Sequence, residues 1–236
     1  MFQVYIGYDP KEAVAYHTLA HSILRRSSIP VSVAPVMQSQ LKGLYTRARG
    51  ATESTEFSLT RFLVPALSQY RGWSLFMDCD MLCRADIAEL AAFTVRSADK
   101  AVLLCKHDYT PGPKRKFLNQ VQTVYPRKNW SSVMLFNNAR CTALTADYVN
   151  TAPGLDLQRF VWLDDSLIGE LPLEWNWLVG EYKHNPAAKI VHFTIGGPYF
   201  SEYSRCDYAE EWFEENRRMN FAAGERDLTE KKSSLA

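Results

Sequence analysis

Two aspartates, Asp78 and Asp80, have the residue type and the spacing that most directly suggest chemistry in this sequence. They follow the apolar run 73–77, Trp-Ser-Leu-Phe-Met, which is typical of a buried β-strand. In extended backbone, residues i and i+2 point to the same side. Two carboxylates so close together repel each other, and a hard divalent cation between them satisfies both. From the tripeptide alone, a polar turn after a core strand is the favoured alternative.

His192 is the third candidate ligand, because it stands at the tip of the apolar run 189–193, which is predicted to be another core strand. Gly196 and Gly197 follow in a loop that allows a ligand to approach the backbone closely. An imidazole together with carboxylates suits Mn²⁺ or a similar ion such as Mg²⁺. For His192 alone, an ordinary hydrogen-bonded core histidine is the alternative.

The elements that must position these residues alternate between strands and helices. Apolar runs predict strands at 2–7, 31–36, 73–77, 101–105, 132–136 and 189–193. Helices are predicted at 11–26, 58–70, from Asp86, at 140–150, 156–170 and 208–221, with Asp9 capping the first of them and Pro10 at its first position. This order predicts an α/β fold with a mostly parallel central sheet flanked by helices. Ligands of such sheets bind beyond the carboxyl ends of the strands, where the two aspartates are expected.

Length and composition favour one domain over residues 1–221, followed by a flexible tail at 222–236. The chain has 236 residues, 47% of them hydrophobic and 22% charged, with a formal net charge of +1. Such a balance gives no sign of a nucleic-acid-binding protein. The five cysteines contain no C-x-x-C motif and predict free thiols in a reducing compartment. Without a membrane-span pattern or a signal-peptide pattern, we expect a cytoplasmic protein; peripheral membrane contact stays open.

Several further segments, in their order, resemble glycosyltransferase family 8 and its bacterial relatives, the glycogenin and lipopolysaccharide galactosyltransferase group. The resemblance extends from about residue 2 to 200. Its segments are the strand ending in Tyr8-Asp9, Ser58-Leu-Thr-Arg61-Phe, Phe76-Met-Asp78-Cys-Asp80-Met-Leu-Cys-Arg-Ala-Asp86-Ile, Ser132-Val-Met-Leu-Phe-Asn137, Asp164-Asp165, Leu171-Pro-Leu-Glu-Trp175-Asn176 and His192-Phe-Thr.

The resemblance implies the GT-A fold, which is the Rossmann-like fold of nucleotide-diphospho-sugar transferases. It further implies a UDP-hexose donor, transfer with retention at the anomeric carbon, and a glycan or lipid-linked acceptor, as in polysaccharide or lipopolysaccharide biosynthesis. Asp78, Asp80 and His192 would hold Mn²⁺, which would bridge the donor phosphates as a Lewis acid.

Other residues take roles from the same resemblance. Tyr8 and Asp9 would lie near the nucleobase, and Arg61 would bind donor phosphate or sugar hydroxyls with its bidentate guanidinium. The remaining matches are Asn137, Gly196 and Gly197 on the donor side, Asp164 and Asp165 beside the reactive sugar carbon, and Trp175 and Asn176 in the acceptor or sugar pocket. Three of these assignments have a simpler alternative: a surface salt bridge for Arg61, a helix N-terminus for the Asp164-Asp165 pair, and core packing for Trp175 and Asn176.

The sequence departs from the family pattern at two places that bear on donor chemistry. Trp130-Ser131-Ser132 stands where the family has Asn-(Ala/Ser)-Gly before a strand. The family's His-x-x-Gly-x-x-Lys ending becomes His192, Ile195 and Pro198, so its phosphate-binding lysine is absent. Loss of a cation beside a diphosphate raises the barrier unless another charge replaces it. Candidates for that replacement are Lys183, His184 and Arg205.

Two other functions compete with this interpretation. A phosphatase of the haloacid dehalogenase type would use Asp78 as nucleophile within Asp78-x-Asp80, although such enzymes carry the motif on their first strand and have Thr or Val where Leu82 stands. A non-catalytic sugar-nucleotide-binding protein would explain the missing lysine.

Overall fold

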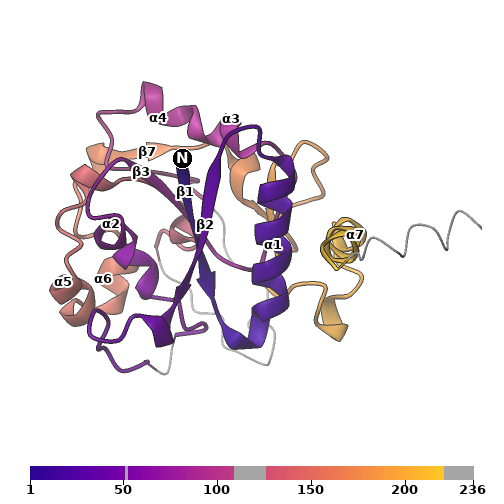
Figure 1. Ribbon diagram of the computed structural model, residues 1–236, viewed down its shortest axis with the longest axis horizontal. Helices are drawn as coiled ribbons and strands as arrows, with labels where there is room; N and C mark the ends of the chain where they lie inside the picture. Colours follow the sequence, from indigo (N-terminus) through magenta and orange to yellow (C-terminus); the bar gives the residue numbers. More distant parts are fainter. Residues whose placement is uncertain (51–52, 109–125, 221–236) are drawn as a thin grey trace, which may run out of the picture.

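The structure is a computed structural model that describes residues 1–50, 53–108 and 126–220 (Figure 1). The tail predicted at 222–236 and the middle of the basic segment 106–129 lie outside the described residues. Among the described residues, no helix combines the length and the apolar character needed to cross a lipid bilayer.

A six-stranded sheet in the order β2-β1-β3-β6-β5-β7 forms the centre of the described part. Its strands are β1 Phe2–Tyr8, β2 Val31–Met37, β3 Trp73–Met77, β5 Val102–Leu104, β6 Val133–Asn137 and β7 Ile168–Glu170. Strand β6 runs antiparallel to both β3 and β5, whereas the β1–β2, β1–β3 and β5–β7 pairs are parallel. The prediction of a mostly parallel α/β sheet is therefore confirmed.

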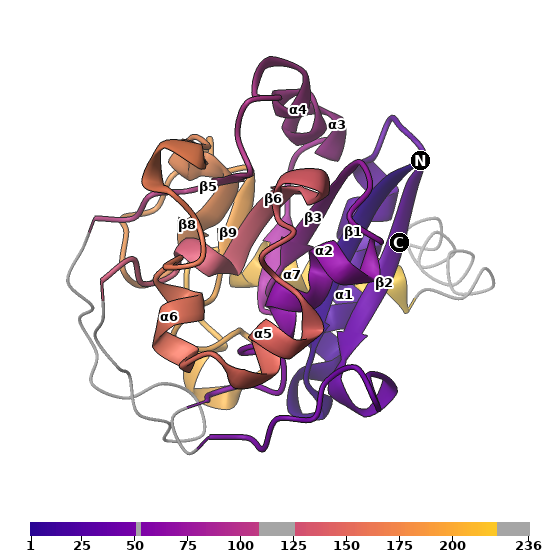
Figure 2. The ribbon, with the colours of Figure 1, turned by 90° about the vertical axis from the view of Figure 1, so that its left-hand side faces the viewer.

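Helices cover both faces of this sheet. Figures 1 and 2 show α1 (Ala13–Arg26) and α7 (Ala209–Met219) on one side, and α2 (Val64–Leu67), α5 (Ala146–Thr151) and α6 (Gly154–Gln158) on the other. Two short helices, α3 (Ile87–Ala91) and α4 (Phe93–Arg96), lie beyond one end of the strands. A helix starting at Asp86 was predicted, and the Asp86 side chain caps α3. Because both faces are covered, the central strands are fully buried and read as continuous apolar runs.

A second, three-stranded sheet in the order β4-β9-β8 lies beside the first. Its strands are β4 Met81–Cys83, β8 Trp177–Leu178 and β9 Ile190–His192. Strand β4 begins directly after Asp80 and pairs antiparallel with β9, and β8 runs parallel to β9. Strands β4 and β8 were not predicted, whereas β9 was predicted from the longer apolar run 189–193.

The prediction of one helix over 156–170 is wrong. Helix α6 ends at Gln158, Phe160 adopts a left-handed backbone with φ of 60°, and the chain then enters β7. Gly169 lies so close to the neighbouring strand that a Cβ atom there would be 2.3 Å from Cδ2 of Leu103. This tertiary contact, invisible in local spacing, explains why a glycine stands in a strand.

Two other predicted helices are shorter than expected. The segment 58–70 forms a 3-10 turn at Thr60–Leu63 and then the single-turn helix α2, with Pro65 near its N-terminus. The segment 140–150 is helical only in α5, after the side chain of Thr145 caps it. Both helices therefore lie where they were predicted in the chain, but they are shorter than predicted.

Helix α7 is held on α1 by a buried carboxylate. The side chain of Glu215, 2% exposed, lies 2.6 Å from Nδ1 of His21, 3.0 Å from Nη2 of Arg25 and 2.7 Å from Nη1 of Arg26. Burial alone would raise the pKa of Glu215, but the hydrogen bonds from Arg25 and Arg26 outweigh it and lower the pKa to about 2.

We expect Glu215→Gln to lower the free energy of unfolding at pH 7 by about 2 kcal/mol, allowing for screening of the partly exposed arginines. The folded pKa of about 2 lies below the ordinary value of 4.5, so this contribution is present above pH 4.5 and is lost as pH falls toward 2. Urea unfolding at pH 7 and pH 3 measures it. Glu214→Gln is the matched control, because Glu214 pairs only with Arg217 and Arg218 on the exposed face among the described residues. Equal effects of the two variants at pH 7 would contradict the assignment.

Candidate functional site

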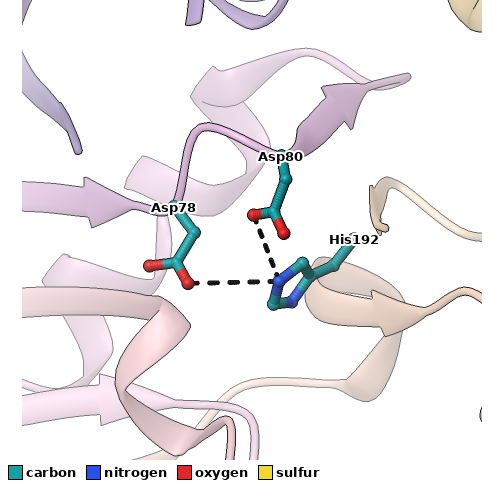
Figure 3. Close-up of side chains that lie close together, drawn as sticks. All are labelled: Asp78, Asp80 and His192. Atoms are coloured by element: carbon teal, nitrogen blue, oxygen red, sulfur yellow. Dashed lines mark ion pairs between the residues drawn. The ribbon is translucent and has the colours of Figure 1, made fainter. Parts of the chain in front are cut away.

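The three predicted ligands converge where the two sheets meet (Figure 3). Strand β3 delivers Asp78, whose backbone N–H donates to the carbonyl of Ser132 at 2.9 Å. The β4–β9 ladder then pairs Met81 with His192, and Phe193 N–H donates to the carbonyl of Asp80 at 2.8 Å. Nε2 of His192 therefore lies 3.3 Å from Oδ1 of Asp80 and 4.0 Å from Oδ2 of Asp78.

This geometry fits one divalent cation. One ligand atom from each of Asp78, Asp80 and His192 lies within 4.8 Å of the others. Neighbouring ligands of an octahedral ion that are about 2.1 Å from it lie about 3 Å apart, close to the distances found here. His192 is 2% exposed and Asp80 9%, so water screens their charges little, and acids so placed need a positive charge. The oxygen and imidazole donors suit Mn²⁺ or Mg²⁺.

Arg61 belongs to this site and is not a surface residue. It is 6% exposed, and its Nη1 lies 2.8 Å from Oδ1 of Asp78 and donates to the carbonyl of Ser131 at 2.9 Å. Its guanidinium carbon lies 5.4 and 5.1 Å from the ring centroids of Phe57 and Phe76. A fixed positive charge is therefore present beside the carboxylates of the candidate cation site.

Tyr8 and Asp9 end β1, the neighbour of β3, and so lie at the same edge of the sheet as Asp78. Asp9 accepts hydrogen bonds from the backbone N–H groups of Lys11 at 3.0 Å and Glu56 at 3.1 Å. The predicted cap is confirmed, although it is a 3-10 turn, Pro10–Glu12, that it begins. Asp9 thus ties the loop before residue 57 to the end of β1.

Glu12 and Tyr199 are site residues that the sequence analysis did not identify. The carboxyl of Glu12 is 1% exposed and accepts a hydrogen bond from the Tyr199 hydroxyl at 2.5 Å. Burial, followed by the charge of Asp80, raises the pKa of Glu12 to about 8. In the sequence, Glu12 looks like an ordinary acidic residue in a first helical turn.

Trp175 and Asn176 lie inside the protein. Trp175 packs in the main hydrophobic core, and the fully buried Asn176 accepts a hydrogen bond from Nδ1 of His192 at 3.0 Å. For Trp175, the simpler alternative of core packing is therefore what the structure shows. Asn176 contacts the predicted ligand His192 on the side of the imidazole ring that faces away from Asp78 and Asp80. Their role toward an acceptor stays a prediction.

Asn137 is not brought to the cluster. It pairs with Trp73 at the start of β3, whereas Asp78 follows the end of that strand. Its side chain donates to the carbonyls of Ala98 at 3.3 Å and Lys100 at 3.1 Å. The antiparallel direction of β6 carries Asn137 to the opposite edge of the sheet, while Ser132, at its other end, reaches the site.

Asp164 and Asp165 are exposed. Asp164 caps a 3-10 turn by accepting from Ser166 N–H at 2.8 Å, and hydrogen bonding with Ser166 lowers its pKa. Asp165 lies 2.6 Å from Nη2 of Arg127 and lines a surface hollow with Arg159. The helix-terminus alternative thus matches the local geometry, and the role of these acids beside a sugar carbon stays a prediction.

Gly196 and Gly197 follow β9 in a buried turn. A Cβ atom on Gly196 would be 2.4 Å from the ring of Tyr203, and one on Gly197 would be 2.1 Å from the ring of Tyr199. These glycines therefore let two aromatic rings pack against the backbone next to His192. Contact of the loop with a donor stays a prediction.

The five cysteines are free thiols, as predicted. Cys79 lies between the two acids in the sequence but is fully buried, and burial raises its pKa well above the ordinary value. A buried, protonated thiol is a packing residue and not a ligand for a hard cation.

Solved structures of glycosyltransferases share this fold. The bifunctional glycosyltransferase WbbM matches with a TM-score of 0.63 at 17% identity, over 91% of this chain and 49% of that one, so this chain spans about half of WbbM. GlyE of Streptococcus pneumoniae TIGR4 gives 0.59 at 14% identity over 99% of this chain and 63% of that one. The galactosyltransferase LgtC gives 0.60 at 11% identity over 95% and 98%. At such identities the likeness shows the fold, which is GT-A.

Sequence comparison adds a relative. No protein-family model matches the chain. The protein named Protein CDI of Arabidopsis thaliana is 48% identical over 229 residues, which are 93% of this chain and 87% of that protein. Identity at this level over nearly the whole length is shared by members of one family, so the chain belongs to the family of the Arabidopsis Protein CDI and carries the GT-A fold.

Proposed function

We propose that the chain is a metal-dependent glycosyltransferase that moves a sugar from a nucleotide-diphospho-sugar to a glycan or lipid-linked acceptor. The donor we propose is a UDP-hexose, and the transfer is retaining. One observation carries the proposal: within a GT-A fold, two carboxylates, an imidazole and a buried guanidinium gather at the carboxyl end of β3. This is the place where ligands of open α/β sheets bind.

Asp78, Asp80 and His192 would hold the cation. When bound, a divalent ion of this kind supplies Lewis-acid charge for the departing nucleoside diphosphate. Arg61 is fixed in advance by Asp78 and by the carbonyl of Ser131, so its charge needs little reorganisation when a diphosphate enters. We propose that Arg61 thereby supplies part of the positive charge that the lysine missing at Pro198 provides in glycosyltransferase family 8.

The flanking residues would form the rest of the donor site. Tyr8 and Asp9 would contact the nucleobase at the end of β1, and the Gly196-Gly197 turn would border the diphosphate. Asp164 and Asp165 would approach the reactive sugar carbon from the segment that precedes β7. Trp175 and Asn176 would belong to the acceptor or sugar pocket, with Asn176 also supporting His192 from behind.

The test is a thermal-unfolding panel of nucleotide sugars with the full chain, with and without Mn²⁺ or Mg²⁺. A ligand at a hundred times its Kd stabilises the native state by about 2.7 kcal/mol. For a chain of this size that corresponds to a rise of about 5–10 °C in Tm. We expect the rise for UDP-sugars, only when the metal is present.

A product assay completes the test. Release of UDP from the stabilising donor would support the transferase, and binding without hydrolysis or transfer would instead indicate a sugar-nucleotide-binding protein. Absence of stabilisation by every nucleotide sugar would overturn both. Hydrolysis of an aryl phosphate that depends on Asp78 would favour the phosphatase.

A further inference from the structure

A line of polar side chains runs from His192 into the protein, away from the carboxylates. Nδ1 of His192 lies 3.0 Å from Oδ1 of Asn176, Nδ2 of Asn176 lies 2.9 Å from Nε2 of His107, and Nδ1 of His107 lies 2.9 Å from the hydroxyl of Tyr182. Asn176 is fully buried and His107 is 6% exposed. Figure 3 shows that the other ring nitrogen of His192 faces Asp78 and Asp80.

The orientation of the Asn176 amide follows from its neighbours. Its Nδ2 lies 2.8 Å from Oγ of Ser132 and 3.3 Å from the carbonyl of Asn129. The carbonyl only accepts, and Ser132 uses its single hydroxyl hydrogen on that same carbonyl at 2.7 Å. Both neighbours are therefore acceptors, so the NH₂ group faces them and Oδ1 faces His192.

An acceptor at this position determines where the proton of His192 resides. Because Oδ1 of Asn176 can only accept, Nδ1 of His192 carries a hydrogen. In the neutral imidazole, Nε2 then has a lone pair directed at the space beside Asp80 and Asp78, which is the form that ligates a metal.

The hydrogen bonds of His107 determine its tautomer in the same way. One hydrogen of Asn176 Nδ2 is directed at Nε2 of His107, so that nitrogen accepts, and Nδ1 of His107 carries the hydrogen that it donates to Tyr182. Burial, followed by the charge of His192, lowers the pKa of His107 to about 3, in agreement with a neutral ring. Because Nε2 of His107 needs a donor, it keeps the side-chain amide of Asn176 from flipping.

We propose that Asn176 and His107 are positioning residues that hold His192 in the Nδ1–H tautomer and thereby raise the affinity of the site for its cation. The proposal rests on the metal site of the proposed function, but the tautomer itself exists without metal. Partners that orient a ligating imidazole from behind contribute about 10- to 100-fold in metal affinity or activity.

The first test needs no metal. In the full chain kept metal-free with EDTA, ¹⁵N correlation spectra distinguish the two tautomers of each of the five histidines. At a pH high enough for both rings to be neutral, we expect His192 and His107 in the Nδ1–H form, with His107→Gln used to assign the His107 signals. A His192 ring in the Nε2–H form would overturn the proposal.

The second test measures Mn²⁺ affinity by electron paramagnetic resonance of the free ion. His107→Leu removes the acceptor and should weaken binding by about 10- to 100-fold, while His107→Gln offers a side-chain carbonyl to Asn176 and should restore most of it. His17→Leu is the control, since it removes an exposed histidine on helix α1.

The outcomes separate the two proposals. His107→Leu binding Mn²⁺ like the wild type, or His107→Gln binding as weakly as His107→Leu at equal Tm, would overturn the positioning role. A wild-type chain that binds no Mn²⁺ would overturn the proposed function, and the tautomer spectra would still decide the role of Asn176 and His107.

Discussion

Asp80→Asn should abolish the Mn²⁺-dependent stabilisation of the chain by UDP and lower Mn²⁺ affinity by at least about a hundredfold. The substitution removes one of two anionic ligands while nearly preserving the shape of the side chain. Residues that only support metal ligands contribute up to about a hundredfold in metal affinity, so the loss of a ligand itself should cost at least as much. Isothermal titration of Mn²⁺ and then of UDP into the full chain measures both. The expected loss is in binding, before any catalytic step.

The matched control is Asp99→Asn. The side chain of Asp99 is 70% exposed and pairs with Lys100 at 3.0 Å. Asp99 has no part in the candidate metal site. It should leave both affinities unchanged. Unchanged affinity in Asp80→Asn as well would remove the proposed metal site, because no other ligand triad of this kind is found among the described residues.

Glu12→Gln should stabilise the metal-free protein by about 2–4 kcal/mol at pH 8 and by little at pH 5. In the folded chain the pKa of Glu12 is raised to about 8, against an ordinary value of 4.5, first by burial and then by Asp80. Between these values the folded state holds a proton that the unfolded state has lost, so stability falls as pH rises from 4.5 to 8. Glutamine is uncharged at every pH and escapes this loss.

Urea unfolding of both proteins in EDTA at several pH values between 5 and 9 measures the difference. The Gln side-chain carbonyl still accepts from the Tyr199 hydroxyl, so the variant keeps that contact. Glu202→Gln, an exposed change in the turn that follows Tyr199, serves as control and should show no pH-dependent gain. A stability difference between Glu12→Gln and wild type that does not change with pH would refute the raised pKa.

The sequence determined the parts of this protein that depend on local pattern. Strands β1, β2 and β3, helix α1, the cap at Asp9 and the start of α3 at Asp86 follow from apolar runs, helical spacing and capping residues within a few positions of one another. The same reading placed Asp78 and Asp80 at a strand end. Their pairing with His192 came from the resemblance to a known family together with that strand pattern.

The tertiary structure decided everything that joins distant segments through short or irregular elements. The three-residue ladder between β4 and β9 sets His192 beside Asp80. The strand at 189–193 was predicted, but β4 is too short for its pairing with that strand to be predicted from the sequence. Gly169 and the left-handed Phe160 turn a predicted helix into an edge strand. The burial of Glu12 and of His107 depends on side chains almost two hundred and about seventy residues away, at Tyr199 and Asn176, because hydrogen bonds of buried groups are satisfied across space and leave no mark in local spacing.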